Sequence, residues 1–200
     1  MSHEAVRQMH KEHDQAIDVL RANTDKFNFH PPCKEGCFHC CYEAVFCDNY
    51  EAAYIVDGLT VTEQIALRVR VASWLEAARA LLPLQMEDGI GIKWREANIP
   101  CPLLVMGRCS VYERRPAGCR AFYAMREPEK CAMPDRIHQK FAYLDRNPMI
   151  CRSLMKYFSS FQRFRTDHLG VHLALLLLDE PDLESGASMG YECEEEPVSQ

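Results

Sequence analysis

The sequence predicts a small, mainly α-helical domain whose helices are separated by irregular, cysteine-rich loops. Apolar residues recur three or four positions apart over several segments, which is the helical period. Prolines and glycines crowd residues 101–134, and 11 of the 200 residues are cysteine. With 48% hydrophobic residues, a chain of this length can bury a single core. We assign residues 1–178 to one domain and the acidic residues 179–200 to a flexible tail.

The first half of the chain predicts three helices. One begins after Ser2, with His13 as a core histidine on an apolar face formed by Val6, Met9, Ile17 and Leu20. Residues 49–58 predict a short helix. Thr60 and Glu63 match a capping box that opens the third helix. The apolar stripe of this helix comprises Val61, Ile65, Val69, Ala72, Leu75, Ala78 and Leu82.

The second half predicts irregular segments followed by three further helices. Residues 85–100 contain Gly89, Gly91 and Pro100 and are expected to be irregular, as are residues 101–134. Asp135–Asp145 predicts a helix with Ile137, Phe141 and Leu144 inward. Asn147 precedes a proline at a first helical position, and the stripe of that helix is Ile150, Leu154, Tyr157, Phe161 and Phe164. Leu169–Leu178 predicts a buried helix.

The charge distribution disfavours nucleic acid and anionic membranes as partners. The net charge is −6, but residues 179–200 hold eight acids and no base, which leaves +2 for residues 1–178. The N-terminal residues are charged and lack the apolar core of a signal peptide, and Leu169–Leu178 is too short to span a bilayer. We therefore expect a cytoplasmic protein. Thiols stay reduced in that compartment, so a high cysteine content there indicates metal ligation rather than disulfides.

Eight cysteines fall into two clusters that predict a metal centre within the core segments 33–47 and 101–131. The clusters are Cys33, Cys37, Cys40 and Cys41, and then Cys101, Cys109, Cys119 and Cys131. Coordination closes a long loop between two such clusters, and Gly36 suits a tight turn toward a cation. Adjacent Cys40 and Cys41 are expected to point in different directions, so that they serve different ions.

Basic residues near the second cluster suit the charge that thiolate ligands bring. Four thiolates around Zn²⁺ carry a formal charge of −2, and nearby cations favour the deprotonated form of a thiol. Residues 108–130 carry a local charge of +3. Arg115 and Arg120 are the strongest candidates for this role, because they flank Pro116 and Cys119 directly.

The stretches CKEGCFHCCYEAVF at 33–46 and CPLLVMGRCSVYERRPAGCRAF at 101–122 resemble the YkgJ-like CxxCxxCC cysteine-cluster family. The family is described as a zinc- or iron-chelating domain. The resemblance implies that its eight characteristic cysteines fall on the two clusters given above. The first gap here has three residues rather than the two in the family's name, which sets Cys33 apart from its counterparts.

The spacing of Cys33, Cys37 and Cys40 also suits a 4Fe–4S cluster, and this leaves alternatives open. The resemblance extends to longer flagellin lysine N-methylases, so an iron–sulfur enzyme is one alternative and a thiol-based redox or metal sensor is another. His39 is a weaker ligand candidate, as is the pair His168 and His172. Three cysteines lie outside the proposed ligand set: Cys47, Cys151 and Cys193. We expect Cys151 in the core and Cys193 free in the tail.

Overall fold

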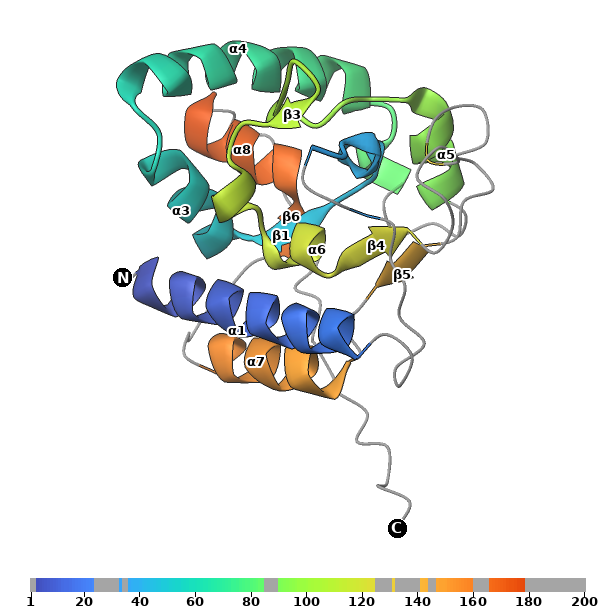
Figure 1. Cartoon of the computed structure of the whole chain (residues 1–200). Helices are drawn as coiled ribbons and strands as arrows, with labels where there is room; N and C mark the ends of the chain where they lie inside the picture. The colour runs from blue at the N-terminus through green and yellow to red at the C-terminus, as the bar shows by residue number, and fades with distance from the viewer. Residues whose placement is uncertain are drawn as a thin grey trace.

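The computed structural model describes residues 3–23, 33, 36–84, 90–124, 131, 141–143, 147–159 and 166–178. Its fold is mainly helical, as the sequence predicts (Figure 1). The α-helices are α1 (His3–Ala22), α3 (Asn49–Asp57), α4 (Val61–Ala78), α5 (Ile90–Ala97), α6 (Ala117–Arg120), α7 (Pro148–Phe158) and α8 (Leu169–Leu177). Three short 3₁₀ helices are η1 (His39–Tyr42), η2 (Leu82–Leu84) and η3 (Tyr112–Arg114).

Within the described residues, six short strands pair into three separate antiparallel ribbons. The strands are β1 (Phe46–Asp48), β2 (Leu104–Val105), β3 (Arg108–Cys109), β4 (Phe122–Ala124), β5 (Phe141–Tyr143) and β6 (Thr166–His168). Strand β1 pairs with β6, β2 with β3, and β4 with β5. Each ribbon therefore consists of only two strands, and no extended sheet forms within the described residues.

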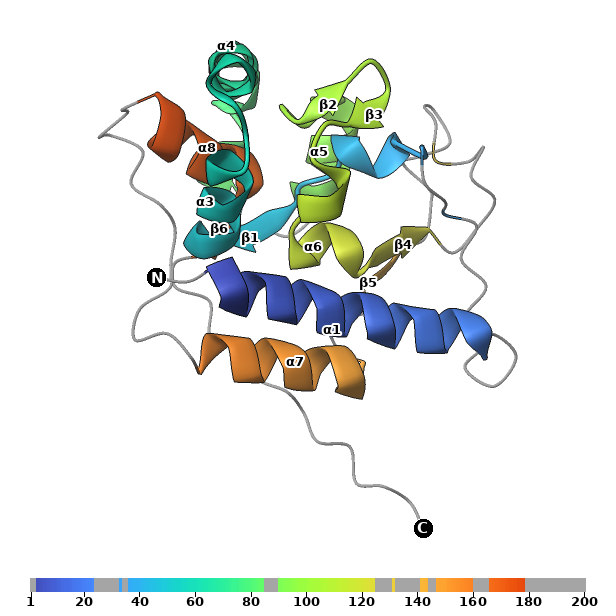
Figure 2. The same ribbon diagram turned by 60° about the vertical axis from the view of Figure 1, so that its left-hand side comes forward.

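Two hydrophobic clusters form the core. The first lies among α3, α4, α5 and α8, where the rings of Trp74 and Trp94 enclose His168 at centroid distances of 4.8 and 4.6 Å. The second lies where α1 packs on α7, and it also takes in Ala117 and Tyr123. Figures 1 and 2 show α1 and α7 side by side beneath the rest of the molecule. Cys47 belongs to the first cluster, Cys101 and Cys109 pack against it, and Cys33 packs against the second.

Most of the predicted helices are confirmed. Helix α1 buries its predicted apolar face together with His13, and α3 and α8 form close to their predicted bounds. The Thr60–Glu63 capping box at the start of α4 is complete. Helix α7 follows the Asn147 cap and buries Ile150, Leu154 and Tyr157, while Phe161 and Phe164 lie outside the described residues.

The predicted buried face of α4 is largely wrong. Val61, Ile65 and Val69 are 73%, 62% and 65% exposed, and Ala72 is exposed as well. Helix α4 instead buries Leu67, Val71, Trp74, Leu75 and Ala78. Both stripes have helical spacing, so periodicity alone does not separate them. The stripe that contains the large Trp74 ring is the buried one, in agreement with the larger apolar area that it removes from water.

Two further predictions are corrected. Residues 90–97 form helix α5 rather than an irregular segment, because Trp94 is buried in the first hydrophobic cluster and this burial offsets the low helix propensity of Gly91. Residues 141–143 form strand β5 rather than part of a helix. Pairing with β4 satisfies their backbone groups, and two of the three are aromatic residues that favour strands. The rest of Asp135–Asp145 lies outside the described residues, as does the tail from 179.

Within the described residues, none of the helices has the length and apolar character needed to cross a bilayer.

Candidate metal centre

The first cysteine cluster lies on a tight turn in front of strand β1. Gly36 has a φ of +84°, a conformation that favours glycine, and it directs the chain into Cys37. Helix η1 then carries Cys40 and Cys41, with the Cys41 amide donating to the carbonyl of Phe38 at 2.9 Å. Glu43, just after η1, accepts from Arg95 of α5 at 2.8 Å, so the unexpected helix α5 anchors this turn.

The second cluster lies on a series of short turns. The β2–β3 hairpin turns at Met106 and Gly107, which have φ of +49° and +73°, and it ends on Cys109. Its connection leads through η3 to α6, which carries Cys119. The amide of Cys101 donates to the carbonyl of Cys41 at 2.7 Å. This main-chain hydrogen bond joins the two cysteine segments directly, although about 60 residues separate them along the chain.

Five of the eight predicted cysteines line one cavity. Aromatic and basic side chains complete its wall. The residues are Cys33, Cys37, Cys40, Cys119 and Cys131 with Arg21, His39, Tyr112, Arg115, Phe122, Tyr123 and Ala124. The cavity thus brings together thiols from both clusters.

The remaining predicted cysteines adjoin this cavity on the side of Cys40. The neighbouring Cys41 thiol raises the pKa of Cys40. After desolvation, the Cys40 thiol is among the groups that raise the pKa of Cys101, Cys109 and Cys119, so it is close to these thiols as well as to the cavity.

The donor atoms suit zinc or iron, although the thiols are spread around the cavity. Among the residues that the structure describes, no three Cys, His, Asp or Glu side chains are arranged as ligands of one ion. Thiolates are the soft donors that zinc and iron sites use. The cavity encloses about 50 Å³, several times the roughly 10–15 Å³ that one water molecule needs. The cavity therefore offers space and suitable donor atoms for an ion.

Burial keeps these thiols protonated when no cation is bound. Desolvation raises the pKa of Cys101 to about 12 and the pKa of Cys119 well above its ordinary value. The positive charge of Arg115 opposes this and lowers the pKa of Cys40, Cys109 and Cys119. Metal ligation requires the thiolate, so a bound cation must displace protons here.

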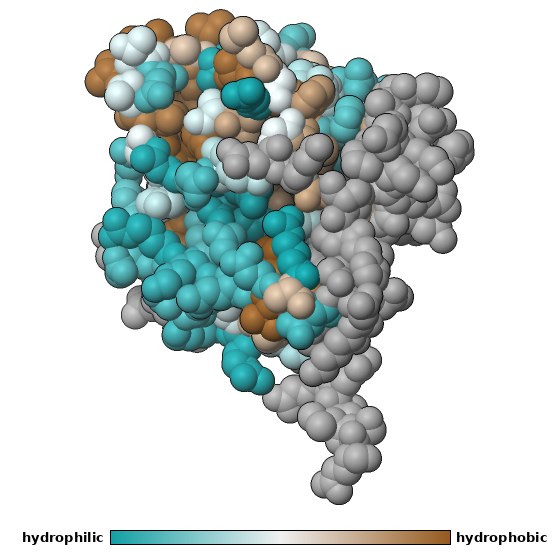
Figure 3. Space-filling model, in the orientation of Figure 1, coloured by the Kyte–Doolittle hydropathy of each residue, from teal (hydrophilic) through white to brown (hydrophobic). Residues whose placement is uncertain are grey.

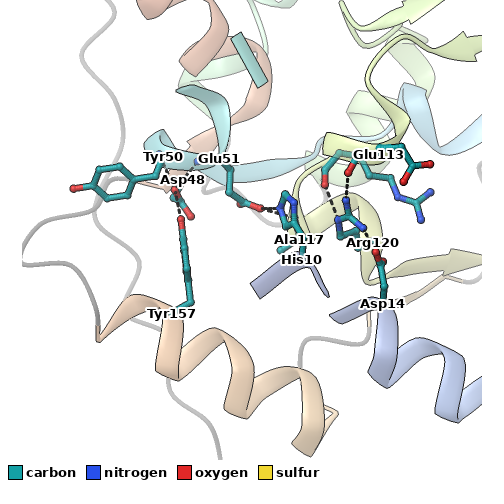
Figure 4. A network of polar contacts seen from close by, with 10 residues as sticks. His10, Asp14, Asp48, Tyr50, Glu51, Glu113, Ala117, Arg120 and Tyr157 are labelled. Atoms are coloured by element: carbon teal, nitrogen blue, oxygen red, sulfur yellow. Dashed lines mark hydrogen bonds and ion pairs between the residues drawn. The ribbon is translucent and has the colours of Figure 1, made fainter. Parts of the chain in front are cut away.

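A buried polar network holds the segment that carries Cys119 (Figure 4). Glu51 is 3% exposed, and one of its oxygens accepts from the Ala117 amide at 2.7 Å and contacts His10 Nε2 at 2.9 Å. Asp48 accepts from the Tyr157 hydroxyl at 3.1 Å. Burial raises the pKa of Glu51 to about 7 and lowers that of His10 to about 3. Sequence patterns did not reveal this network, because its members are far apart along the chain.

Arg120 is part of the same support rather than of the cavity wall. It is 3% exposed and donates to Asp14 Oδ2 at 2.5 Å and to the carbonyls of Glu113 and Arg115. The sequence predicts that Arg115 and Arg120 both compensate thiolate charge, but the structure gives the two arginines different positions. Arg115 lines the cavity, whereas Arg120 joins helix α1 to the loop from η3 to α6.

The secondary candidates are placed as follows. His39 lines the cavity, beside Phe38. His168 is enclosed by Trp74 and Trp94 and accepts from the Gly170 amide as the cap of α8, so its environment is that of a structural histidine. Cys47 is a buried, free thiol in the first hydrophobic cluster.

Cys151 departs in part from what the sequence predicts. It is buried on α7, as expected, but it is disulfide-bonded, whereas we expected reduced thiols throughout. The nine other cysteines within the described residues form no disulfide. Cys193 lies outside the described residues.

Comparison with protein families identifies the domain that contains this cavity. The family model CxxCxxCC, described as "putative zinc- or iron-chelating domain", matches residues 32–164, about two thirds of the chain. The chain belongs to the CxxCxxCC family. No curated protein and no solved structure matches it.

The CxxCxxCC match contains all eight predicted cysteines and both segments that form the cavity. Helix α1, which precedes residue 32, contributes Arg21 to the cavity wall and Asp14 to the support of Arg120. The CxxCxxCC domain of this chain is therefore completed by a helix outside the matched residues. The family description supports zinc or iron as the bound metal.

Proposed function

We propose that this protein binds zinc or iron through thiolates of both cysteine segments. The observation that carries the proposal is the cavity in which Cys33, Cys37 and Cys40 face Cys119 and Cys131. Thiols collected from distant parts of a chain, beside a cation such as Arg115, form a donor set that a metal ion would stabilise. The family description is consistent with this chemistry.

We infer two groups of ligands that share Cys40. One comprises Cys33, Cys37 and Cys131, which line the cavity with Cys40. The other comprises Cys41, Cys101, Cys109 and Cys119, which interact electrostatically with Cys40. A bound metal would supply positive charge that keeps these thiols deprotonated, and it would tie the segment 101–124 to the turn at 36–43. In this proposal the metal orders segments that have few regular backbone hydrogen bonds of their own.

An iron–sulfur enzyme is the second candidate, and one observation favours it. The thiols of Cys33, Cys37 and Cys40, whose spacing suits a 4Fe–4S cluster, all line the same cavity. Aromatic side chains of Tyr112 and Tyr123 complete the wall, as they would in a pocket that excludes water from such a cluster.

Anaerobic purification of the full chain separates these candidates. Metal content, acid-labile sulfide and the visible spectrum are measured on one preparation. Colourless protein with stoichiometric zinc supports the zinc-binding protein and eliminates the cluster. Brown protein with sulfide supports the iron–sulfur candidate. Protein that takes up neither zinc nor iron contradicts the proposal as a whole.

Cys40→Ser tests the shared position of this thiol, with Cys47→Ala as the matched control. Both thiols are free, but Cys47 belongs to the hydrophobic core and does not line the cavity. We expect Cys40→Ser to lose most of its metal and Cys47→Ala to retain it. Full metal content in Cys40→Ser would remove Cys40 from the ligands.

A further inference from the structure

Arg115 is the arginine of the second segment that lines the cavity. It follows η3 and precedes Pro116, and its guanidinium carbon lies 4.0 Å from the centre of the Tyr112 ring. Tyr112 also shares a side-chain hydrogen bond with it. The stacked ring fixes the guanidinium plane at the wall of the cavity, among the thiols.

The neighbouring arginines have other partners. Arg114 is half-buried and donates to the carbonyl of Gly58 at 2.5 Å, on the side of α3. Arg120 uses its three nitrogens on Asp14 and two backbone carbonyls. In contrast, Nε of Arg115 is buried and has no hydrogen-bond partner among the residues that the structure describes. A buried N–H donor without an acceptor is costly, so such a group indicates a missing acceptor.

We propose that Nε of Arg115 donates a hydrogen bond to a metal-bound thiolate, and so acts as a positioning residue for the metal centre. This inference rests on the proposed function. The acceptor is a thiolate of the group Cys40, Cys109 and Cys119, the thiols that the charge of Arg115 reaches. Arg21 lies near the other end, where it donates to the Cys33 carbonyl and stacks on Tyr123.

Such a hydrogen bond has two effects on a thiolate site. The guanidinium charge offsets part of the negative charge that several thiolates bring to one ion. The direction of the N–H bond also fixes the orientation of the sulfur atom, as outer partners of metal ligands commonly do. Lysine retains the charge but has no group that matches Nε, so Arg115→Lys separates the two effects.

The test measures Zn²⁺ affinity of the full chain, prepared metal-free without oxygen, by competition with a chromophoric chelator. Arg115→Gln should bind Zn²⁺ about 10–100-fold more weakly than the unmodified chain. The Zn²⁺ affinity of Arg115→Lys should lie between that of Arg115→Gln and that of the unmodified chain. Arg114→Gln is the matched control and should stay within about twofold, because Arg114 donates to Gly58 and does not line the cavity.

The outcomes separate the two proposals. If the unmodified chain takes up neither Zn²⁺ nor iron, the proposed function fails and this inference with it. If the chain binds Zn²⁺ and Arg115→Gln matches it within about twofold, only the role of Arg115 fails. An equal loss of Zn²⁺ affinity in Arg114→Gln would likewise overturn the role of Arg115, because any nearby charge would then suffice.

Circular dichroism of the metal-free variants checks their folding, and Arg115→Lys replaces Arg115→Gln if the glutamine variant does not fold. Lysine affinity equal to that of arginine would exclude the Nε contact.

Discussion

Single buried polar residues determine where the cavity wall lies. Arg120 bonds helix α1 through Asp14 and the loop from η3 to α6 through two carbonyls. Glu51 holds the next turn through the Ala117 amide. Their substitution should therefore alter stability first, and metal binding through the displaced loop.

Arg120→Met should destabilise the protein by about 2–4 kcal/mol, because it leaves two backbone carbonyls and Asp14 without their donor. The free energy of unfolding from urea titration measures this. Arg7→Met removes an exposed ion pair with Glu4 on the same helix and should cost less than about 0.5 kcal/mol. Similar losses in both variants would contradict the structural role of Arg120.

The stability of Glu51→Gln, relative to that of the unmodified chain, should increase as the pH rises from 5 to 8. Burial raises the pKa of Glu51 to about 7 in the folded protein, whereas the unfolded chain releases this proton near pH 4.5. The folded state thus retains a proton that the unfolded state loses, and stability decreases as the pH rises through this window.

Glutamine carries no such proton, so the difference in unfolding free energy between the two proteins should shift by at least about 1 kcal/mol. Urea titrations of both proteins at pH 5 and pH 8 give this difference. A constant difference over this range would show that Glu51 titrates normally.

At the level of elements, the buried face of α4 yields a direct test. Leu67→Ala should cost about 2–5 kcal/mol, because Leu67 is 0% exposed. Ile65→Ala should cost less than about 0.5 kcal/mol, because Ile65 lies on the exposed stripe. The melting temperatures of the two variants give this comparison. A larger loss in Ile65→Ala than in Leu67→Ala would show that the face predicted from periodicity is the buried one.

Gly170→Ala should destabilise the start of α8. A Cβ atom at this position would lie 2.5 Å from the ring of Trp74. Trp74 is buried and packed against His168, so its ring has little room to move. Overpacking of this kind costs about 1–3 kcal/mol. A gain in melting temperature, as expected for alanine in an open helix, would contradict the close packing.

The elements that sequence predicted well have strong local signals. The capping box of α4 and the Asn147–Pro148 start of α7 are properties of adjacent residues, and the structure contains both. Helix α5 and strand β5 were missed because distant partners decide them. Trp94 needs the cluster around α8, and residues 141–143 need β4. The exposed stripe of α4 gathers apolar residues on the upper end of the molecule, whereas much of the rest of this face is polar (Figure 3).

At the scale of the whole molecule, metal removal should loosen the cysteine segments and leave the two hydrophobic clusters intact. No predicted ligand is a buried member of either cluster, although Cys101 and Cys109 pack against the first and Cys33 against the second. We expect a chelator to lower the melting temperature while the helical circular dichroism persists, since ligand binding stabilises only the state that holds it. Complete loss of helix on chelation would show that the metal is required for folding.

The clustered cysteines identify the candidate site in the sequence, but the sequence does not identify the polar residues that hold the site in place. Spacing identifies thiols as donors, and the structure places five of them on one cavity. The assignment of Arg115 and Arg120 to different tasks depends on which carbonyls and carboxylates lie within reach, and only the folded chain shows this. The same holds for Glu51, 66 residues from the amide that it binds.

The hydrogen bond from the Cys101 amide to the Cys41 carbonyl needs neither sulfur chemistry nor an ion. It joins the segments that carry Cys41 and Cys101 before any ion binds. If the chain binds its ion as proposed, the folded polypeptide would keep these two segments joined whether or not the ion is present.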